Sequence, residues 1–199
     1  MTGFLLAICL STRAEVKLPA IFSDGMVMQQ KTNANLWGTA TPNKNVTITT
    51  SWDGKQYVAT ADKNGAWKLA VPTPEAGGPY TVTFDDGSLK TLNNILIGEL
   101  WLCSGQSNME MPMKGFKNQP VENANMDILR SKNPNIRLFT VKRTSTFTPQ
   151  TDVVGTWKEA TPANVRDFSA TAYYFGRLIN EILDVPVGLV VAAWGGSAC

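Results

Sequence analysis

The sequence contains no histidine, although it carries 18 lysine and arginine residues and 16 aspartate and glutamate residues. Histidine is the usual base that activates a serine nucleophile, and it is also a common zinc ligand. The absence of histidine argues against a zinc site. It also leaves two alternatives for any serine at a reactive position: the serine is not a nucleophile, or its base lies on residues that this chain does not contain.

Cysteine is scarce as well, and the charge is nearly balanced. The three cysteines, Cys9, Cys103 and Cys199, do not have the spacing of metal ligands. We expect Cys103 to be a small core residue rather than half of a disulfide with Cys199. The net charge is only +2 and the basic residues are scattered, so nothing in the composition indicates nucleic acid or an anionic membrane as a partner. Neither of the common glycine-rich phosphate-binding motifs is present.

The first 14 residues are typical of a secretory signal peptide. Residues 4–10 form a short apolar run, which is followed by Ser-Thr-Arg-Ala at 11–14 with small residues at positions 12 and 14. The run is too short to span a membrane. No basic residue precedes it, so a mobile apolar tail is the alternative. We expect a secreted or periplasmic protein whose mature chain begins at Glu15.

Residues 15–94 have the pattern of an all-β domain. Asp-Gly and Asn-Gly pairs and other turn formers separate short runs of alternating or apolar residues, which is a hairpin signal. The expected strands are 34–38, 46–50, 56–61, 66–70 and 80–84. Strands at this spacing favour a small β-sandwich. We expect Trp37, Trp52 and Trp67 to pack in its core and at its docking surface, with sugar stacking as the alternative.

Residues 95–199 change to an alternation of strands and helices. We expect strands at 95–102, 136–141 and 187–193 and helices at 121–131 and 168–183. This order predicts an α/β domain with a doubly wound parallel sheet. The second helix has an apolar stripe that we expect to be buried, formed by Phe168, Ala172, Phe175, Ile179 and Ile182. Three strands are few for such a sheet, so we expect an exposed apolar edge at 187–193 and interpret the domain as truncated.

A polar turn holding two serines follows the first strand of this domain. Residues 101–109 read Trp-Leu-Cys-Ser-Gly-Gln-Ser-Asn-Met. Gly105 provides the freedom for a sharp reversal, and Ser107 would then present its hydroxyl at the carboxyl edge of the sheet. Met109 stands where the Gly-x-Ser-x-Gly motif has its second glycine. On the local pattern, Ser107 is therefore either a nucleophile or a polar turn residue.

A second turn, Gly195-Gly196-Ser197, follows the last strand. Its backbone N–H groups could stabilise the oxyanion of a tetrahedral intermediate, together with the N–H of Ser107. A flexible turn is the alternative. Gln106 and Asn108 flank the serine as supporting residues, and we interpret Glu110 as a helix-start carboxylate rather than a base.

These segments together resemble the sialate O-acetylesterases of the SGNH hydrolase superfamily. Residues 99–110 are similar to the nucleophile block of that family, and Ala-Trp-Gly-Gly-Ser at 193–197 is similar to its second block. Residues 18–30 resemble the entry into the N-terminal β domain of the family, and 61–67 and 76–80 resemble its hairpins. The resemblance covers nearly all of residues 18–199 in the expected order.

The resemblance implies a serine esterase that removes acetyl groups from sialic acid without a metal or organic cofactor. Ser107 would be the nucleophile, and Gly195 and Gly196 would contribute to the oxyanion hole. The family also uses an asparagine in a third block and a late Asp-x-x-His pair, which have no counterpart here. We therefore expect the chain alone to be inactive. An acetyl-xylan-type esterase and a non-catalytic carbohydrate-binding remnant are the alternatives.

Overall fold

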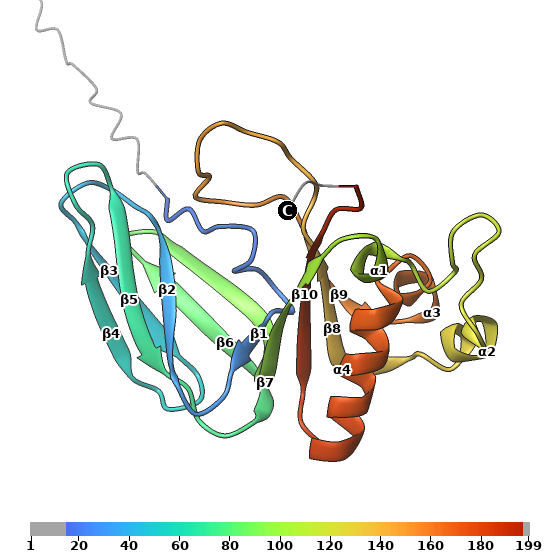
Figure 1. The fold of residues 1–199 in the computed structure, drawn as a ribbon. Coiled ribbons are helices and arrows are strands. Elements are labelled where there is room, and N and C mark those ends of the chain that lie inside the picture. The colour runs from blue at the N-terminus through green and yellow to red at the C-terminus, as the bar shows by residue number, and fades with distance from the viewer. Residues whose placement is uncertain (1–14, 197–199) are drawn as a thin grey trace, which may run out of the picture.

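The computed structural model describes residues 15–196, which form a large mixed sheet, a smaller two-stranded sheet and several helices (Figure 1). The predicted signal segment 1–14 and residues 197–199 lie outside the described residues. The strands of the first half are β1 (Val27–Gln29), β2 (Asn33–Thr39), β3 (Asn45–Thr50), β4 (Gln56–Thr60), β5 (Ala66–Pro72), β6 (Gly77–Asp85) and β7 (Leu89–Gly105). The remaining elements are α1 (Ser107–Glu110), α2 (Ala124–Leu129), β8 (Asn133–Thr140), β9 (Trp157–Ala160), α3 (Pro162–Val165), α4 (Ala170–Leu183) and β10 (Val187–Ala193).

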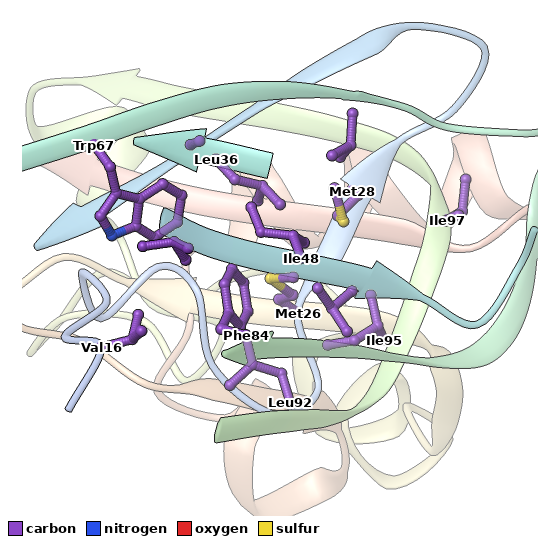
Figure 2. Packing of buried hydrophobic residues seen from close by; sticks show 14 of the residues in the cluster. Val16, Met26, Met28, Leu36, Ile48, Trp67, Phe84, Leu92, Ile95 and Ile97 are labelled. Atoms are coloured by element: carbon purple, nitrogen blue, oxygen red, sulfur yellow. The ribbon is translucent and has the colours of Figure 1, made fainter. Parts of the chain in front are cut away.

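The first half consists of two sheets that share one core, as expected of a small β-sandwich. β2 pairs with β5 in the smaller sheet, while β4, β3, β6 and β7 are neighbours in the larger one. Leu36 and Trp67 come from the smaller sheet and Ile48 and Phe84 from the larger, and all four are buried (Figure 2). The five strands expected here all form, because polar turns alternate with residues that can fill this core.

The three tryptophans of this half have different surroundings. Trp67 is 4% exposed and packs in the core, as expected. Trp52 makes an edge-to-face contact with Tyr80, and Trp37 makes one with Phe22 in the N-terminal segment. Trp37 is 38% exposed, so it lies at the margin of the core rather than inside it.

β7 is a long strand that crosses the predicted boundary between residues 94 and 95. Its first part pairs with β6 in antiparallel orientation, and its last part pairs with β10 in parallel orientation. Hydrogen-bonded strands therefore continue through both halves of the chain without a linker. Two separate clusters of buried side chains nevertheless lie on either side, one centred on the first half and one on the second. The division into 15–94 and 95–199 stays a prediction.

The second half contains the three expected strands, and β7, β10 and β8 run parallel to one another. The sheet is mixed rather than parallel, because β9, which was not predicted, pairs with β8 in antiparallel orientation. The expected exposed edge at 187–193 is wrong. β10 lies between β7 and β8 and is hydrogen bonded on both sides, so its apolar side chains are in the interior of the sheet.

α4 covers one face of β8 and β10 (Figure 1), and the expected stripe is confirmed only in part: Phe168 and Ala172 are buried, and Ile179 packs against the same core. A Cβ atom at Gly176 would lie 2.5 Å from Leu189 Cδ1, so the helix approaches β10 closely at this residue. Because small residues mediate that approach, Ala172 and Gly176 are buried, whereas Phe175 and Ile182 are 36% and 67% exposed. The prediction that these two larger residues would be buried is wrong.

The opposite face of this sheet packs against the N-terminal segment. The indole N–H of Trp157 in β9 donates to the backbone oxygen of Ile21 over 2.8 Å, and the Trp157 ring packs against Phe139 of β8. Both aromatic residues belong to the core of the first half. In the part of the chain that the structure describes, helices therefore cover only one face of β8 and β10. The expected doubly wound sheet, which has helices on both faces, is not observed.

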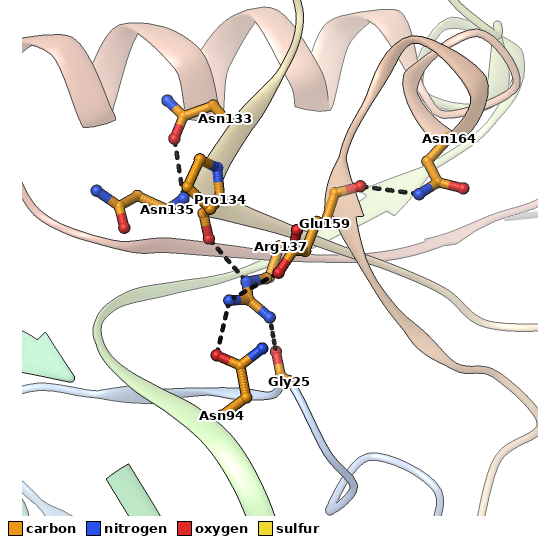
Figure 3. Close-up of polar contacts among 8 residues, drawn as sticks. All are labelled: Gly25, Asn94, Asn133, Pro134, Asn135, Arg137, Glu159 and Asn164. Carbon is orange, nitrogen blue, oxygen red and sulfur yellow. Dashed lines mark hydrogen bonds and ion pairs between the residues drawn. The ribbon is translucent and has the colours of Figure 1, made fainter. Parts of the chain in front are cut away.

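Arg137 of β8 connects the two halves from a buried position (Figure 3). Its guanidinium donates to the backbone oxygens of Pro134 and Gly25 and to the side-chain oxygen of Asn94, over 2.8, 3.5 and 3.1 Å. It also pairs with Glu159 of β9 over 3.3 Å. Burial lowers the pKa of this guanidinium, and the Glu159 charge opposes that effect. The contacts fix the middle of β8 against β7 at Asn94 and against the segment before β1 at Gly25.

Candidate active site

The turns that follow β7 and β10 lie side by side because the two strands are parallel neighbours in register. Ala193 is the partner of Gly105, the last residue of β7. Beyond the strands, the N–H of Trp194 donates to the oxygen of Gly105 over 3.1 Å. The strand at 187–193 therefore lies beside the strand that leads into the serine turn. The sequence-predicted residues Ser107, Gly195 and Gly196 are therefore brought to the same edge of the sheet.

Ser107 is the first residue of α1, directly after a sharp reversal of the chain. Gly105 has φ of +148°, a conformation that residues with a side chain rarely adopt. The N–H groups of Met109 and Glu110 then donate to the oxygen of Gln106 over 3.0 and 2.9 Å and close the first helical turn. Ser107 is exposed, and within residues 15–196 its hydroxyl forms no hydrogen bond. The turn thus presents a serine hydroxyl to which no described residue is hydrogen bonded as a base.

Gly195 approaches the Ser107 side chain closely. A Cβ atom at this position would lie 3.1 Å from Ser107 Oγ and 2.6 Å from Glu110 Oε2. A Cβ atom at Gly196 would meet no atom within 4 Å, but Gly196 has φ of +75°. Glycine is therefore favoured at 195 by the lack of space and at 196 by the backbone conformation.

Glu110 lies in the first turn of α1, as its interpretation as a helix-start carboxylate predicts, but the sequence does not indicate the contacts that its side chain makes. One carboxylate oxygen accepts the backbone N–H of Gly195, and the other pairs with the guanidinium of Arg143. The Glu110 side chain is only 17% exposed. Its place three residues after Ser107 is visible in the sequence, but nothing in the spacing indicates that it reaches a glycine 85 residues later in the chain.

The flanking residues tie α1 to the start of α4. The backbone oxygen of Asn108 accepts the hydroxyl of Thr171 over 2.9 Å. Ser169 accepts the N–H of Ala172 at the start of α4, and its hydroxyl lies 3.6 Å from the sulfur of Met109. Asn108 and Gln106 thus support the turn through their backbone oxygens in these contacts. A role for the side chains of Gln106 and Asn108 in supporting the turn stays a prediction.

A cavity of about 480 Å³ borders the turn at the carboxyl ends of β7, β8 and β10. The segment between β8 and β9 forms one wall, and the residues around Trp194 form another. Lining residues include Ser104, Gly105, Arg143, Thr146, Gln150 and Trp194. The lining combines hydroxyl, amide and charged side chains with apolar ones and a half-exposed indole, while Ser107 and Gly195 lie next to the lining residues rather than among them.

The described residues show neither a metal cluster nor a membrane helix. Between residues 15 and 196, no three cysteine or acidic side chains gather closely enough to hold a metal ion. No helix in the same range has the length and apolar character needed to cross a bilayer. Cys103 is buried with a free thiol, consistent with a core residue, while Cys199 lies outside the described residues.

Comparison with known proteins identifies relatives along most of the chain, although no protein-family model matches it. The sialate O-acetylesterase of Mus musculus is 29% identical over 191 residues, which are 86% of this chain and 34% of the mouse protein. That of Homo sapiens is 27% identical over 195 residues, 89% of this chain and 36% of the human protein. The chain thus spans about a third of the length of these curated relatives.

A solved structure supports the same relationship. The crystal structure of a carbohydrate acetylesterase from Xanthomonas citri matches with a TM-score of 0.85 and 33% sequence identity. The match covers 92% of this chain and 41% of the Xanthomonas chain. The fold and the sequence therefore agree, and the chain is a homologue of the sialate O-acetylesterases that corresponds to about a third of their length.

Proposed function

We propose that this chain carries the nucleophile half of a secreted or periplasmic carbohydrate esterase that removes acetyl groups from O-acetylated sialic acid. The observation that carries the proposal is the contact between the two turns: Ser107 and Gly195 meet at the ends of neighbouring parallel strands, beside a cavity. The names of the mammalian relatives support sialate as substrate, and the Xanthomonas relative supports an acetylated carbohydrate more generally.

The proposed reaction is acyl transfer through an acetyl-enzyme. Ser107 Oγ attacks the acetyl carbonyl carbon as its proton passes to a base, and backbone N–H groups stabilise the resulting oxyanion. The intermediate collapses when the carbon–oxygen bond to the sugar breaks, and the sugar alcohol leaves with a proton from the base. Water then attacks the acetyl-enzyme and releases acetate and free Ser107.

The base for this reaction comes from outside this chain. The sequence has no histidine, and within residues 15–196 the Ser107 hydroxyl has no hydrogen-bond partner. Glu110 is not the base in this arrangement, because its carboxylate accepts the Gly195 N–H and pairs with Arg143 and forms no hydrogen bond with the Ser107 hydroxyl. We accordingly propose that this chain alone does not turn over ester substrates.

Acetate release from a panel of substrates tests the proposal. The protein is expressed from the longest reading frame that contains this chain and is assayed on O-acetylated sialic acid and on acetylated xylan. Preferential hydrolysis of the sialic acid ester is expected. Preference for acetylated xylan would replace the substrate assignment by an acetyl-xylan-type esterase. Glycan binding without hydrolysis of any ester would instead favour the carbohydrate-binding remnant.

A further inference from the structure

Groups from three distant parts of the chain are in contact at one position beside the serine turn. These are Glu110 itself in α1, the backbone N–H of Gly195 after β10, and the guanidinium of Arg143 after β8. We infer that Glu110 is a positioning residue that holds the Gly195 turn against Ser107 and thereby leaves the N–H of Gly196 as the oxyanion donor. The inference rests on the proposed esterase function for its kinetic consequence, but not for the contacts themselves.

The geometry of α1 places Glu110 where it can fix the turn. Residues three apart on a helix lie on the same face, so the Glu110 side chain is directed to the side on which Ser107 presents its hydroxyl. Gly195 is in contact with both residues, as the 3.1 and 2.6 Å approaches of a Cβ atom at position 195 to Ser107 Oγ and Glu110 Oε2 show. Holding Gly195 therefore sets the distance of the whole turn from the nucleophile.

Arg143 fixes Glu110 from the opposite side. A carboxylate that accepts both a guanidinium and a backbone N–H forms charge-assisted hydrogen bonds, which are stronger than neutral ones. Because the Glu110 side chain is only 17% exposed, water competes weakly for these contacts. Arg143 also lines the cavity, so the same ion pair connects the cavity wall to the turn.

The two glycines consequently have different roles. The N–H of Gly195 is occupied by Glu110, which makes it a structural contact in this arrangement. By contrast, the N–H groups of Gly196 and Ser107 form no hydrogen bond with any residue in the range 15–196. An oxyanion requires backbone donors that no other acceptor occupies. Gly196 and Ser107 therefore form the donor pair, and Gly195 and Glu110 form the support beneath it.

Amide hydrogen exchange of this chain, followed by NMR, tests the support directly. We compare the unsubstituted chain with Glu110→Ala, Glu110→Gln and the matched control Glu122→Gln, an exposed carboxylate outside the turn. Loss of a charge-assisted hydrogen bond is expected to accelerate exchange of the Gly195 amide by about tenfold or more in Glu110→Ala. Glu110→Gln, which keeps an oxygen acceptor, restores part of the protection, and Glu122→Gln changes nothing.

Unchanged exchange at Gly195 in Glu110→Ala would overturn the inference, as would equal protection of the Gly195 and Gly196 amides in the unsubstituted chain. If the Glu110→Ala chain does not fold, the test uses Glu110→Gln alone. In that variant the inference still requires faster amide exchange that is limited to Gly195. A general loss of protection throughout Glu110→Gln would show a structural role only and would also overturn the inference.

The kinetic consequence is measured on the protein expressed from the longest reading frame that contains this chain. Glu110→Ala is expected to lower kcat by roughly tenfold or more with little change in KM, because the misplaced turn affects the transition state rather than substrate binding. A change in KM alone would overturn the positioning role. Absence of turnover in the unsubstituted protein would refute the proposed function instead, and the exchange experiment would then decide on Glu110 independently.

Discussion

Ala193 lies directly opposite Gly105 in the parallel pairing of β10 with β7. The two strands therefore end at the same level, and the turns that follow them are forced into contact. This single register explains why Ser107 and Gly195, which are 88 positions apart in the sequence numbering (195 minus 107), approach each other closely. A shift of one residue in this pairing would separate the two turns.

Replacement of Gly195 by alanine should disable the site. The added Cβ atom would lie 2.6 Å from Glu110 Oε2 and 3.1 Å from Ser107 Oγ, so the turn must move away from the nucleophile. Displacements of this kind typically lower activity by about a hundredfold. The measurement is kcat/KM on an O-acetylated sugar.

Gly196→Ala is the matched comparison for that variant. Its Cβ atom would meet open space, and the cost is confined to the backbone strain at φ of +75°, about 1–2 kcal/mol. We expect a modestly lower melting temperature and a smaller loss of activity than in Gly195→Ala. Equal activity of Gly195→Ala and the unsubstituted protein would contradict the close contact between the turns.

Arg137→Met should destabilise the fold. The substitution leaves the oxygens of Gly25 and Asn94 without their buried donor and removes the ion pair with Glu159. Because unpaired buried polar groups are costly, we expect the free energy of unfolding to fall by roughly 2–4 kcal/mol. Denaturant titration of the chain gives this value.

Glu159→Gln provides the control for Arg137. The Glu159 side chain is 45% exposed, and ion pairs of exposed groups contribute less than about 1 kcal/mol. A large loss in Glu159→Gln with none in Arg137→Met would show that the hydrogen bonds of the guanidinium do not connect the two halves.

Asp127 should make the stability of the chain depend on pH in the acid range. Its carboxylate accepts Arg177 over 2.8 Å and the Tyr174 hydroxyl over 2.7 Å, and these hydrogen bonds, the one from Arg177 first, lower its pKa below 3.8. Burial, followed by the hydrogen bond to Asp127, raises the pKa of Tyr174 to about 12, so this donor stays protonated.

A carboxyl group whose pKa is lower in the folded than in the unfolded chain stabilises the fold at any pH above its unfolded pKa. This stabilisation is lost as the pH falls through the pKa of the folded state. The unsubstituted chain should therefore melt higher than Asp127→Asn at neutral pH, by a few degrees for about 1 kcal/mol. The difference should decrease as the pH falls below 3.8. A difference that grows with acidification would contradict the assignment.

Local sequence patterns predicted most of the elements because each expected strand or helix carries its own turn signals and periodicity. The 187–193 strand has the predicted bounds in the structure, as β10. Its position between β7 and β8 was not predictable, since an apolar run indicates burial but not which strands pair with it. The exposure of Phe175 and Ile182 was missed for a related reason: the close approach of α4 at Gly176 depends on Leu189 in a different element.

The candidate site was predictable only in part. Ser107 and the glycine turn have local signatures, and parallel pairing of their strands suffices to bring them together. Glu110 and Arg143 have no such signature, because their contacts join residues that are close only in the folded chain. The base could not be assigned to any residue, since no histidine is present in the sequence.

The most direct test of the proposed esterase site is acetate release from O-acetylated sialic acid by the protein expressed from the longest reading frame that contains this chain. Ser107→Ala is compared with Ser88→Ala, the same change in the turn between β6 and β7. We expect Ser88→Ala to keep the full rate and Ser107→Ala to lose about a thousandfold or more in kcat. Full activity of Ser107→Ala would contradict the assignment of Ser107 as the nucleophile.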